Sequence, residues 1–263
     1  MGRSVACSYA VTGSGPAVFM VHGIGARKSI WDRLTAKLND DFTCISFDLR
    51  GHGDSPRGEL PFTLDDLVAD LEALRVRLGI ERAHFIGHSL GGMIIPAYAR
   101  AHPEHVAALG LLSTSSFRSP EDRQLVKAIA DQVDSQGIAN VMPGLTGRWF
   151  TEPFLAARQD LVDWRLNQAL TTPPDVFSHV FHIYADTEMS PWLHEVEAPS
   201  LVLTGEFDGD CNPAVNDQIA KALPNGHLMI LKDLKHAILV EAPDRVAVQV
   251  SAFLRQHNHL ASL

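Results

Sequence analysis

Six short apolar runs recur along the chain, separated by amphipathic segments, and none of them alternates between apolar and polar residues. They are rich in Val, Ile and Phe: PAVFMVHG at 16–23, TCISFDLRG at 43–51, AHFIGHS at 83–89, VAALGLLS at 106–113, SLVLTGEFD at 200–208 and HLMILKD at 227–233. A strand that is covered on both faces needs apolar residues at successive positions. Strands of this kind alternating with helices predict an α/β protein with a mainly parallel sheet.

The segments between these runs carry helix signals. Apolar residues from Leu64 to Leu78 recur at helical spacing, with Thr63 and Asp66 placed as a capping pair and Gly79 as a stop. Two further helices are expected where a proline can occupy the first helical position, after Asn212 and after Ala242.

The alternation of strands and helices lapses between residues 116 and 197. Prolines interrupt helical-looking pieces there, and the segment holds three of the four tryptophans. We interpret it as a helical cap inserted into a core made of residues 1–115 and 198–263. The alternative is a continued doubly wound core whose strands are poorly marked.

Composition excludes several classes of function. The 263 residues contain 22 Lys and Arg against 31 Asp and Glu, a net charge of −9, with no basic run, so a nucleic-acid partner is not expected. The N-terminus lacks an export or lipidation signal, and the apolar runs fall short of the roughly 20 residues that span a bilayer. We therefore expect a cytoplasmic protein without a membrane partner.

Cysteine and histidine usage argues against structural metals and disulfides. Cys7, Cys44 and Cys211 are odd in number and form no CxxC pair, which indicates reduced thiols. The thirteen histidines are scattered and no HExxH motif occurs, so neither a metal nor another cofactor is expected.

The sharpest chemical signal is GHSLGG at 87–92, which follows a predicted strand and precedes a predicted helix. A serine at such a tight turn has strained backbone angles and needs small neighbours two positions away, which explains the flanking glycines. The turn exposes the hydroxyl and points the next helix N-terminus at it. Ser89 is therefore the candidate nucleophile.

A serine hydroxyl needs a base that is itself oriented by an acid. Asp208 closes the run at 200–208, and His236 follows the run at 227–233, so the order along the chain is Ser89, Asp208, His236. Asp210 is the competing acid, placed deeper in the loop.

The tetrahedral oxyanion of acyl transfer is stabilised by two fixed backbone N–H groups. HGIG at 22–25 ends a predicted strand in a turn free of bulky side chains around Ile24. The amides of Ile24 and of Leu90, the residue after the nucleophile, are the candidates. His22 is expected to brace this loop.

Five ordered motifs together resemble the α/β-hydrolase superfamily over the full length of the chain: HGIG at 22–25, DLRGHGDS at 48–55, GHSLGG at 87–92, GEFD at 205–208 and His236. The resemblance implies an α/β-hydrolase fold, with a mainly parallel eight-stranded sheet flanked by helices, a Ser-His-Asp triad and a helical cap inserted after the sixth strand. Superfamily members with an aspartate nucleophile are excluded by Ser89.

Within the superfamily the chain is similar to 3-oxoadipate enol-lactonases and small carboxylesterases. It departs from many enol-lactonases in the oxyanion loop at His22 and Gly23, and from carbon–carbon bond hydrolases, which usually carry Asn, at His88. Three alternatives stay open: carbon–carbon cleavage of a ring-cleavage product, perhydrolase or haloperoxidase activity, and a slow or non-catalytic ligand-binding receptor.

The leading hypothesis is a cofactor-free serine hydrolase that acts on a small ester, lactone or related carbonyl compound, as a monomer or homodimer. Aromatic residues of the insertion are expected to form either an apolar wall of the pocket or the core of the cap itself: Trp149, Phe150, Trp164, Phe177 and Phe181. If the substrate is anionic, one of Arg118, Arg148 or Arg165 should pair with its carboxylate.

Overall fold

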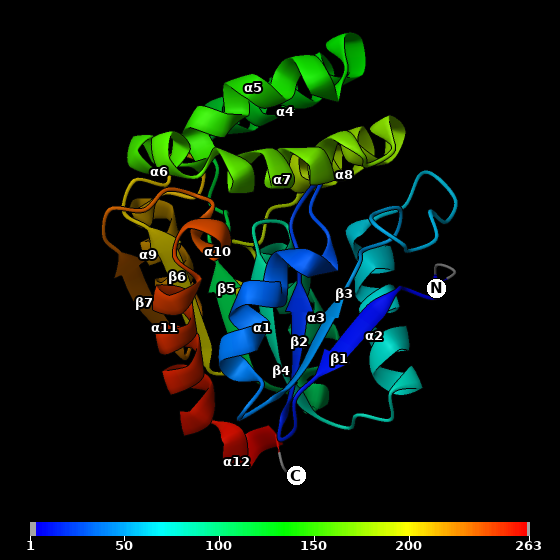
Figure 1. Ribbon diagram of the computed structural model, residues 1–263. Coiled ribbons are helices and arrows are strands. Elements are labelled where there is room, and N and C mark those ends of the chain that lie inside the picture. The colour runs from blue at the N-terminus through cyan, green and yellow to red at the C-terminus, as the bar shows by residue number, and fades with distance from the viewer. Residues whose placement is uncertain (1–3, 262–263) are drawn as a thin grey trace.

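The computed structural model of the chain describes residues 4–261 and contains one twisted sheet with helices on both faces and above one end (Figure 1). In these residues the sheet has seven strands in the order β1-β3-β2-β4-β5-β6-β7. The strands are β1 (Tyr9–Thr12), β2 (Ala17–Val21), β3 (Thr43–Phe47), β4 (Ala83–His88), β5 (Val106–Leu112), β6 (Ser200–Gly205) and β7 (Gly226–Leu231).

All six predicted strands are confirmed, and every neighbouring pair among them is parallel. The sequence analysis missed β1, which pairs antiparallel with β3 at the edge of the sheet. Its four residues are all exposed, so the strand lacks the apolar run that marks the buried ones.

The expected number of strands was wrong by one, and the helical insertion follows the fifth strand, β5, instead of the sixth. The segment before β1 does not join the sheet in the described residues, because its amides bind side chains of the core. Val5 donates to Asp70 Oδ1 at 2.7 Å, and Ser8 donates to Ser55 Oγ at 2.8 Å.

Two apolar layers cover the sheet. One packs α2 (Leu64–Arg77), α3 (Gly91–Ala101) and α9 (Pro213–Ala222) against one face. The other packs α1 (Asp32–Leu38), α10 (Ile238–Glu241) and α11 (Pro243–Gln256) against the opposite face. The remaining short elements are η1 (Lys28–Trp31), η2 (Pro103–His105) and α12 (Asn258–Ala261) outside the insertion, and η3 (Leu193–Glu195) near its end.

The predicted helix starts are confirmed. Thr63 caps α2 with a reciprocal pair of hydrogen bonds to Asp66, and the chain leaves that helix through Gly79 at a φ of 66°. Asn212 caps α9 by accepting from the Val215 amide, and Pro213 and Pro243 occupy first helical turns.

The insertion contains five α-helices, which lie above the carboxyl ends of the parallel strands (Figure 1). They are α4 (Pro120–Gln136), α5 (Ile138–Trp149), α6 (Glu152–Ala157), α7 (Gln159–Leu170) and α8 (Pro174–Asp186). A third apolar cluster joins α4, α5, α7 and α8 to one another. No helix within residues 4–261 has both the length and the apolar character needed to cross a membrane.

Candidate active site

Ser89 lies in the tight turn between β4 and α3, with a φ of 56° in the left-handed region that residues with a side chain rarely adopt. The close packing of the turn requires glycine on both sides. A Cβ on Gly87 would lie 2.2 Å from the Gly91 carbonyl oxygen, and a Cβ on Gly91 would lie 2.0 Å from the Val21 carbonyl oxygen. The strained turn therefore presents the Ser89 side chain at the end of the sheet.

His236 and Asp208 meet beside this turn. His236 follows β7, Asp208 lies three residues beyond the end of β6, and His236 Nδ1 donates to Asp208 Oδ2 at 2.9 Å. The carboxylate is held by its own loop, because Oδ1 accepts from the amides of Cys211 at 2.8 Å and Asp210 at 3.1 Å. Asp210, the competing acid of the sequence analysis, forms an ion pair with Arg148 instead.

The pair shifts the pKa of both partners. Burial disfavours the imidazolium of His236, but the charge of Asp208 and the hydrogen bond outweigh burial and raise the pKa of His236 well above its ordinary value of 6.5. Burial also disfavours the carboxylate, and His236 and the Cys211 amide outweigh it and lower the pKa of Asp208. Asp208 is therefore ionised and can stabilise a positive charge on His236.

The loop after β2 offers a free amide. Neither the Ile24 nor the Leu90 N–H donates to another group within residues 4–261. Ile24 lines the same pocket as Ser89, and Leu90 follows Ser89 in the tight turn. The peptide between Gly23 and Ile24 is fixed at its carbonyl end, where Gly23 O accepts from His22 Nδ1 at 2.8 Å and from the Ala26 amide at 3.2 Å. The C=O and N–H of a trans peptide point in opposite directions, so the hydrogen bonds to the Gly23 carbonyl also fix the direction of the Ile24 N–H.

Two buried histidines, both with neutral rings, hold this loop in place. His22 Nε2 accepts from the Leu49 amide at 2.9 Å, and His52 Nε2 accepts from the Gly25 amide at 3.2 Å. An acceptor nitrogen carries no proton, so each ring has its proton on Nδ1. Burial lowers the pKa of His22 to about 4 and that of His52 to about 3, which keeps both rings neutral near pH 7.

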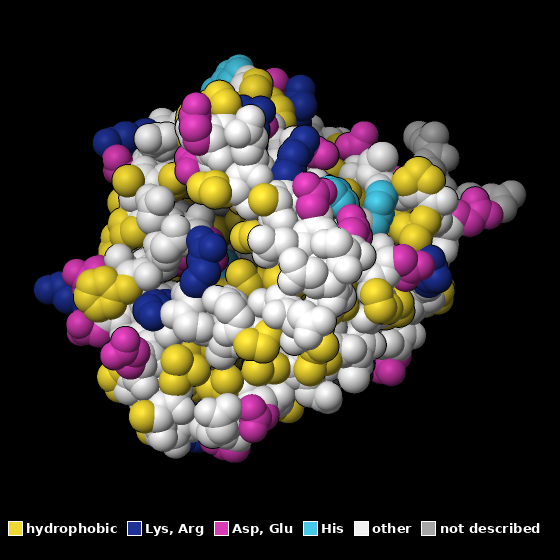
Figure 2. All heavy atoms as spheres, turned by 90° about the horizontal axis from the view of Figure 1, so that it is seen from above, with side chains coloured by type: hydrophobic (Ala, Val, Ile, Leu, Met, Phe, Trp, Pro, Cys, Tyr) yellow, Lys and Arg dark blue, Asp and Glu magenta, His cyan; other side chains and the backbone are white. Residues whose placement is uncertain are grey.

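One pocket joins these groups. Ser89 and His236 both line it, together with Gly23 and Ile24, and it encloses about 930 Å³ of empty space, its open mouth included. No hydrogen bond joins the Ser89 hydroxyl to His236 in the part of the chain that the structure describes. Figure 2 looks onto the side that carries the inserted helices and shows a hollow with hydrophobic side chains in its wall and basic side chains at its rim.

Comparison with known proteins shows the family of the chain. The model of the alpha/beta hydrolase fold matches residues 16–243. The chain belongs to this family. It is 26% identical to 3-oxoadipate enol-lactonase 2 of Acinetobacter baylyi over 258 residues, which cover 97% of this chain and 96% of the relative.

Two solved structures illustrate the likeness in fold. A thermophilic esterase from Thermogutta terrifontis is 26% identical, with a TM-score of 0.89 over 97% of this chain and 94% of its own. The enol-lactonase from Burkholderia xenovorans LB400 is 24% identical, with a TM-score of 0.89 over 95% and 97%. The chain thus resembles two enol-lactonases and an esterase over nearly its whole length.

Among the aromatic residues expected to form an apolar wall, Trp149, Phe177 and Phe181 line the pocket of this alpha/beta hydrolase. Phe150 instead packs fully buried in the core beneath the insertion. Trp164 does not line the pocket and is 37% exposed. Its neighbour Arg165 lies on the inward face of α7, and successive helix residues are about 100° apart, so Trp164 faces outward.

The three candidate arginines have different surroundings. Arg165 lines the pocket, whereas Arg118 and Arg148 do not. Arg118 is 7% exposed and donates to the carbonyl oxygens of Tyr184 at 2.8 Å and Thr187 at 3.3 Å, so packing in the insertion occupies it.

The sequence analysis missed His88 as a contributor to the site. Its Nε2 donates to the backbone carbonyl of His236 at 3.0 Å, and the two rings lie 4.9 Å apart. Burial lowers the pKa of His88 to about 3, so it stays neutral and cannot compete with His236 as the base. Its position next to the nucleophile in GHSLGG was the available signal.

Proposed function

We propose that this alpha/beta hydrolase is a cofactor-free serine hydrolase that cleaves a small carboxylic ester or enol-lactone through an acyl-enzyme. One observation carries the proposal: the strained Ser89 turn and the hydrogen-bonded pair of His236 and Asp208 open into the same pocket, beside two unoccupied amides. These are the parts that nucleophilic acyl transfer needs.

In the proposed reaction, His236 Nε2 takes the hydroxyl proton of Ser89 as Oγ attacks the substrate carbonyl carbon. The carbonyl oxygen becomes an oxyanion, which accepts hydrogen bonds from the amides of Ile24 and Leu90. Collapse breaks the bond to the leaving oxygen, which takes the proton from His236. The acyl group is then bonded to Ser89.

Deacylation repeats these steps with water. Neutral His236 removes a proton from water as the water oxygen attacks the acyl carbon, and the returning proton restores the Ser89 hydroxyl when the acid leaves. Asp208 stabilises the imidazolium in both halves of the cycle. All these groups come from one chain, so the proposed reaction needs no second subunit, in a monomer or a homodimer.

The pocket favours a small substrate that has an apolar body and a carboxylate. Its wall is largely apolar, and Arg165 is its cation, with no carboxylate partner within residues 4–261. Desolvation lowers the pKa of the guanidinium to about 10, and a substrate anion would offset that cost. The likeness to a 3-oxoadipate enol-lactonase supports the same class.

We also propose the division of the chain into a core, residues 1–115 and 198–263, and a helical cap, residues 116–197. The cap would shape the pocket, because Trp149, Phe177 and Phe181 contribute its wall from α5 and α8. Cap side chains would then select the substrate while core side chains perform the chemistry.

A panel of neutral aryl esters, carboxylate-bearing esters, lactones and enol-lactones tests the proposal. We expect hydrolysis of at least one class without added metal or cofactor, with release of the free acid detected by mass. Turnover of a carbon–carbon ring-cleavage product but of no ester or lactone would contradict the proposed bond class. Binding without any turnover would favour a receptor.

A further inference from the structure

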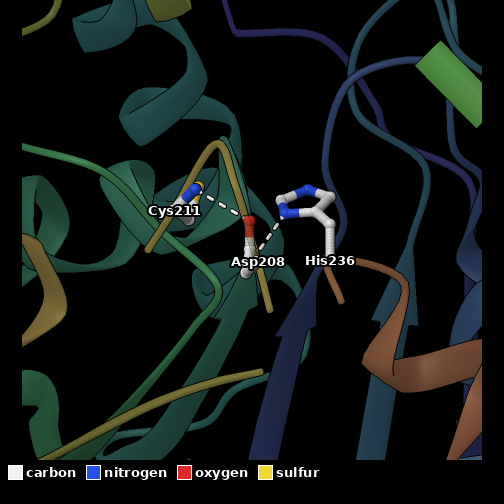
Figure 3. A group of neighbouring side chains, drawn as sticks. All are labelled: Asp208, Cys211 and His236. Carbon is white, nitrogen blue, oxygen red and sulfur yellow. Dashed lines mark hydrogen bonds and ion pairs between the residues drawn. The ribbon is translucent and has the colours of Figure 1, made fainter. Parts of the chain in front are cut away.

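A thiol lies beside the acid and the base of the site. Cys211 follows Asp208 by three residues, and its sulfur, one Asp208 carboxylate oxygen and one His236 ring nitrogen all lie within 4.8 Å of one another. Figure 3 shows the three side chains together, with Asp208 between Cys211 and the imidazole in this view. Thiolate, imidazole and carboxylate are the three ligand types that Zn²⁺ binds in proteins.

The surroundings hold these donors in place. Asp208 Oδ1 is fixed by two backbone amides, which leaves Oδ2 on the side of His236. The Tyr184 hydroxyl lies 3.5 Å from the Cys211 sulfur, and Thr204 Oγ1 donates to the Cys211 carbonyl at 2.8 Å. Such outer contacts orient metal ligands and strengthen binding.

Charge and access also suit a cation. A carboxylate and a thiolate together carry two negative charges, so a bound divalent ion makes the group neutral, as a buried site requires. Cys211 and Asp208 are buried, but His236 lines the open pocket and provides the route of entry. Cys7 and Cys44 belong to no such group within the described residues.

We propose that Asp208, Cys211 and His236 form a binding site for one soft divalent ion, Zn²⁺ or Cd²⁺, and that the bound ion inhibits the enzyme. Inhibition rests on the proposed function, whereas binding does not. The ion replaces the thiol proton of Cys211, which is released to solvent. It also bonds to His236 Nδ1, so the ring proton moves to Nε2, and Nε2 can no longer accept the Ser89 proton.

Cadmium binding is measured first in Ser89→Ala, where the ligands are intact and no turnover is needed. Titration with Cd²⁺ should produce the ultraviolet charge-transfer band of one cadmium–thiolate bond per chain. The band should vanish in Ser89→Ala/Cys211→Ala and persist in the matched control Ser89→Ala/Cys44→Ala, which removes a buried thiol elsewhere. A band that persists without Cys211, or no band at all, would overturn the site.

Inhibition is measured in the chain with Ser89 present. Zn²⁺ should inhibit hydrolysis, and Cys211→Ala should raise the Zn²⁺ concentration for half-inhibition by about tenfold or more, because even the loss of a residue that only orients a ligand costs about 10–100-fold in metal affinity. Cys211→Ser, which keeps nearly the thiol's size, should behave like Cys211→Ala. Equal Zn²⁺ sensitivity in the wild type and both variants would overturn the inhibitory half. If the wild type hydrolyses nothing, the cadmium titration still decides the binding half.

Discussion

The guanidinium of Arg165 donates to the carbonyl oxygen of Ile24 at 3.0 Å and to that of Gly25 at 2.8 Å. One cationic side chain of the inserted helix α7 therefore holds the loop whose Ile24 amide we assign to the oxyanion. The same guanidinium lies over the ring of Trp149, another residue that lines the pocket, at 5.0 Å from the ring centroid. Arg165 thus links the insertion to the loop that we assign to the oxyanion.

Replacing Arg165 should distinguish acidic from neutral substrates. Arg165→Met removes the pocket cation, and a lost hydrogen bond to a charged group costs about 1.5–3 kcal/mol, so KM for a carboxylate-bearing ester should rise about tenfold or more relative to a neutral isostere. Arg158→Met is the control, because neither Arg158 nor its ion-pair partner Asp160 lines the pocket. The same KM ratio in Arg165→Met and the wild type would exclude a carboxylate contact.

Removing the anchor of the oxyanion loop should lower kcat more than it changes KM. His22→Ala removes the Nδ1 donor that fixes the Gly23 carbonyl, so the Ile24 N–H is no longer held in the direction of the oxyanion. Loss of an oxyanion donor costs about 10²–10³ in kcat, and we expect an effect up to that size. His84→Ala removes a buried histidine far from the pocket and controls for lost packing. Equal kcat in the two variants would argue against the anchor.

Asp208→Asn should abolish most turnover while leaving substrate binding nearly unchanged. The amide cannot stabilise the imidazolium and favours the wrong ring tautomer, which in the known serine triads lowers kcat about 10⁴-fold. Asp210→Asn serves as the matched control, because Asp210 pairs with Arg148 and not with His236. Steady-state kinetics of both variants on one ester would decide the identity of the acid, and a larger loss in Asp210→Asn would reverse our assignment.

Activity should rise with pH through a single ionisation. Only neutral His236 can accept the Ser89 proton, and Asp208 raises the pKa of His236 above 6.5, so kcat/KM should fall as the pH drops below an apparent pKa that is higher than 6.5. His22, His52 and His88 have a pKa of about 3 to 4 and stay neutral over this range. A pH profile with slope one tests this, and a profile flat from pH 5 to 8 would contradict it.

The parts of the fold that follow from local sequence were predictable. Ala17–Val21 is apolar at every position and Ser200–Gly205 is apolar at 201–203, because both faces of these strands are buried. Thr63 with Asp66 marks a helix start by direct hydrogen bonds. The edge strand Tyr9–Thr12 has no such signature, since its side chains are exposed.

The contacts that build the site join residues far apart in the chain, and these were harder to predict. The order of Ser89, Asp208 and His236 suggested three parts of one site. Nothing local, however, shows that Arg165 reaches Ile24, 141 residues away, or that Trp164 faces solvent. Cys211 appeared only as an unpaired thiol, because its closeness to His236 depends on how the loops after β6 and β7 pack.

The most direct test of the account is the intact mass of the protein after exposure to a fluorophosphonate, with Ser89→Ala treated in parallel. The probe bonds to an activated serine oxygen and releases fluoride, so it needs no knowledge of the substrate. We predict one adduct on the wild type and none on Ser89→Ala, with both proteins melting at the same temperature. A folded wild type that gains no adduct, or an adduct that survives in Ser89→Ala, would contradict Ser89 as the nucleophile.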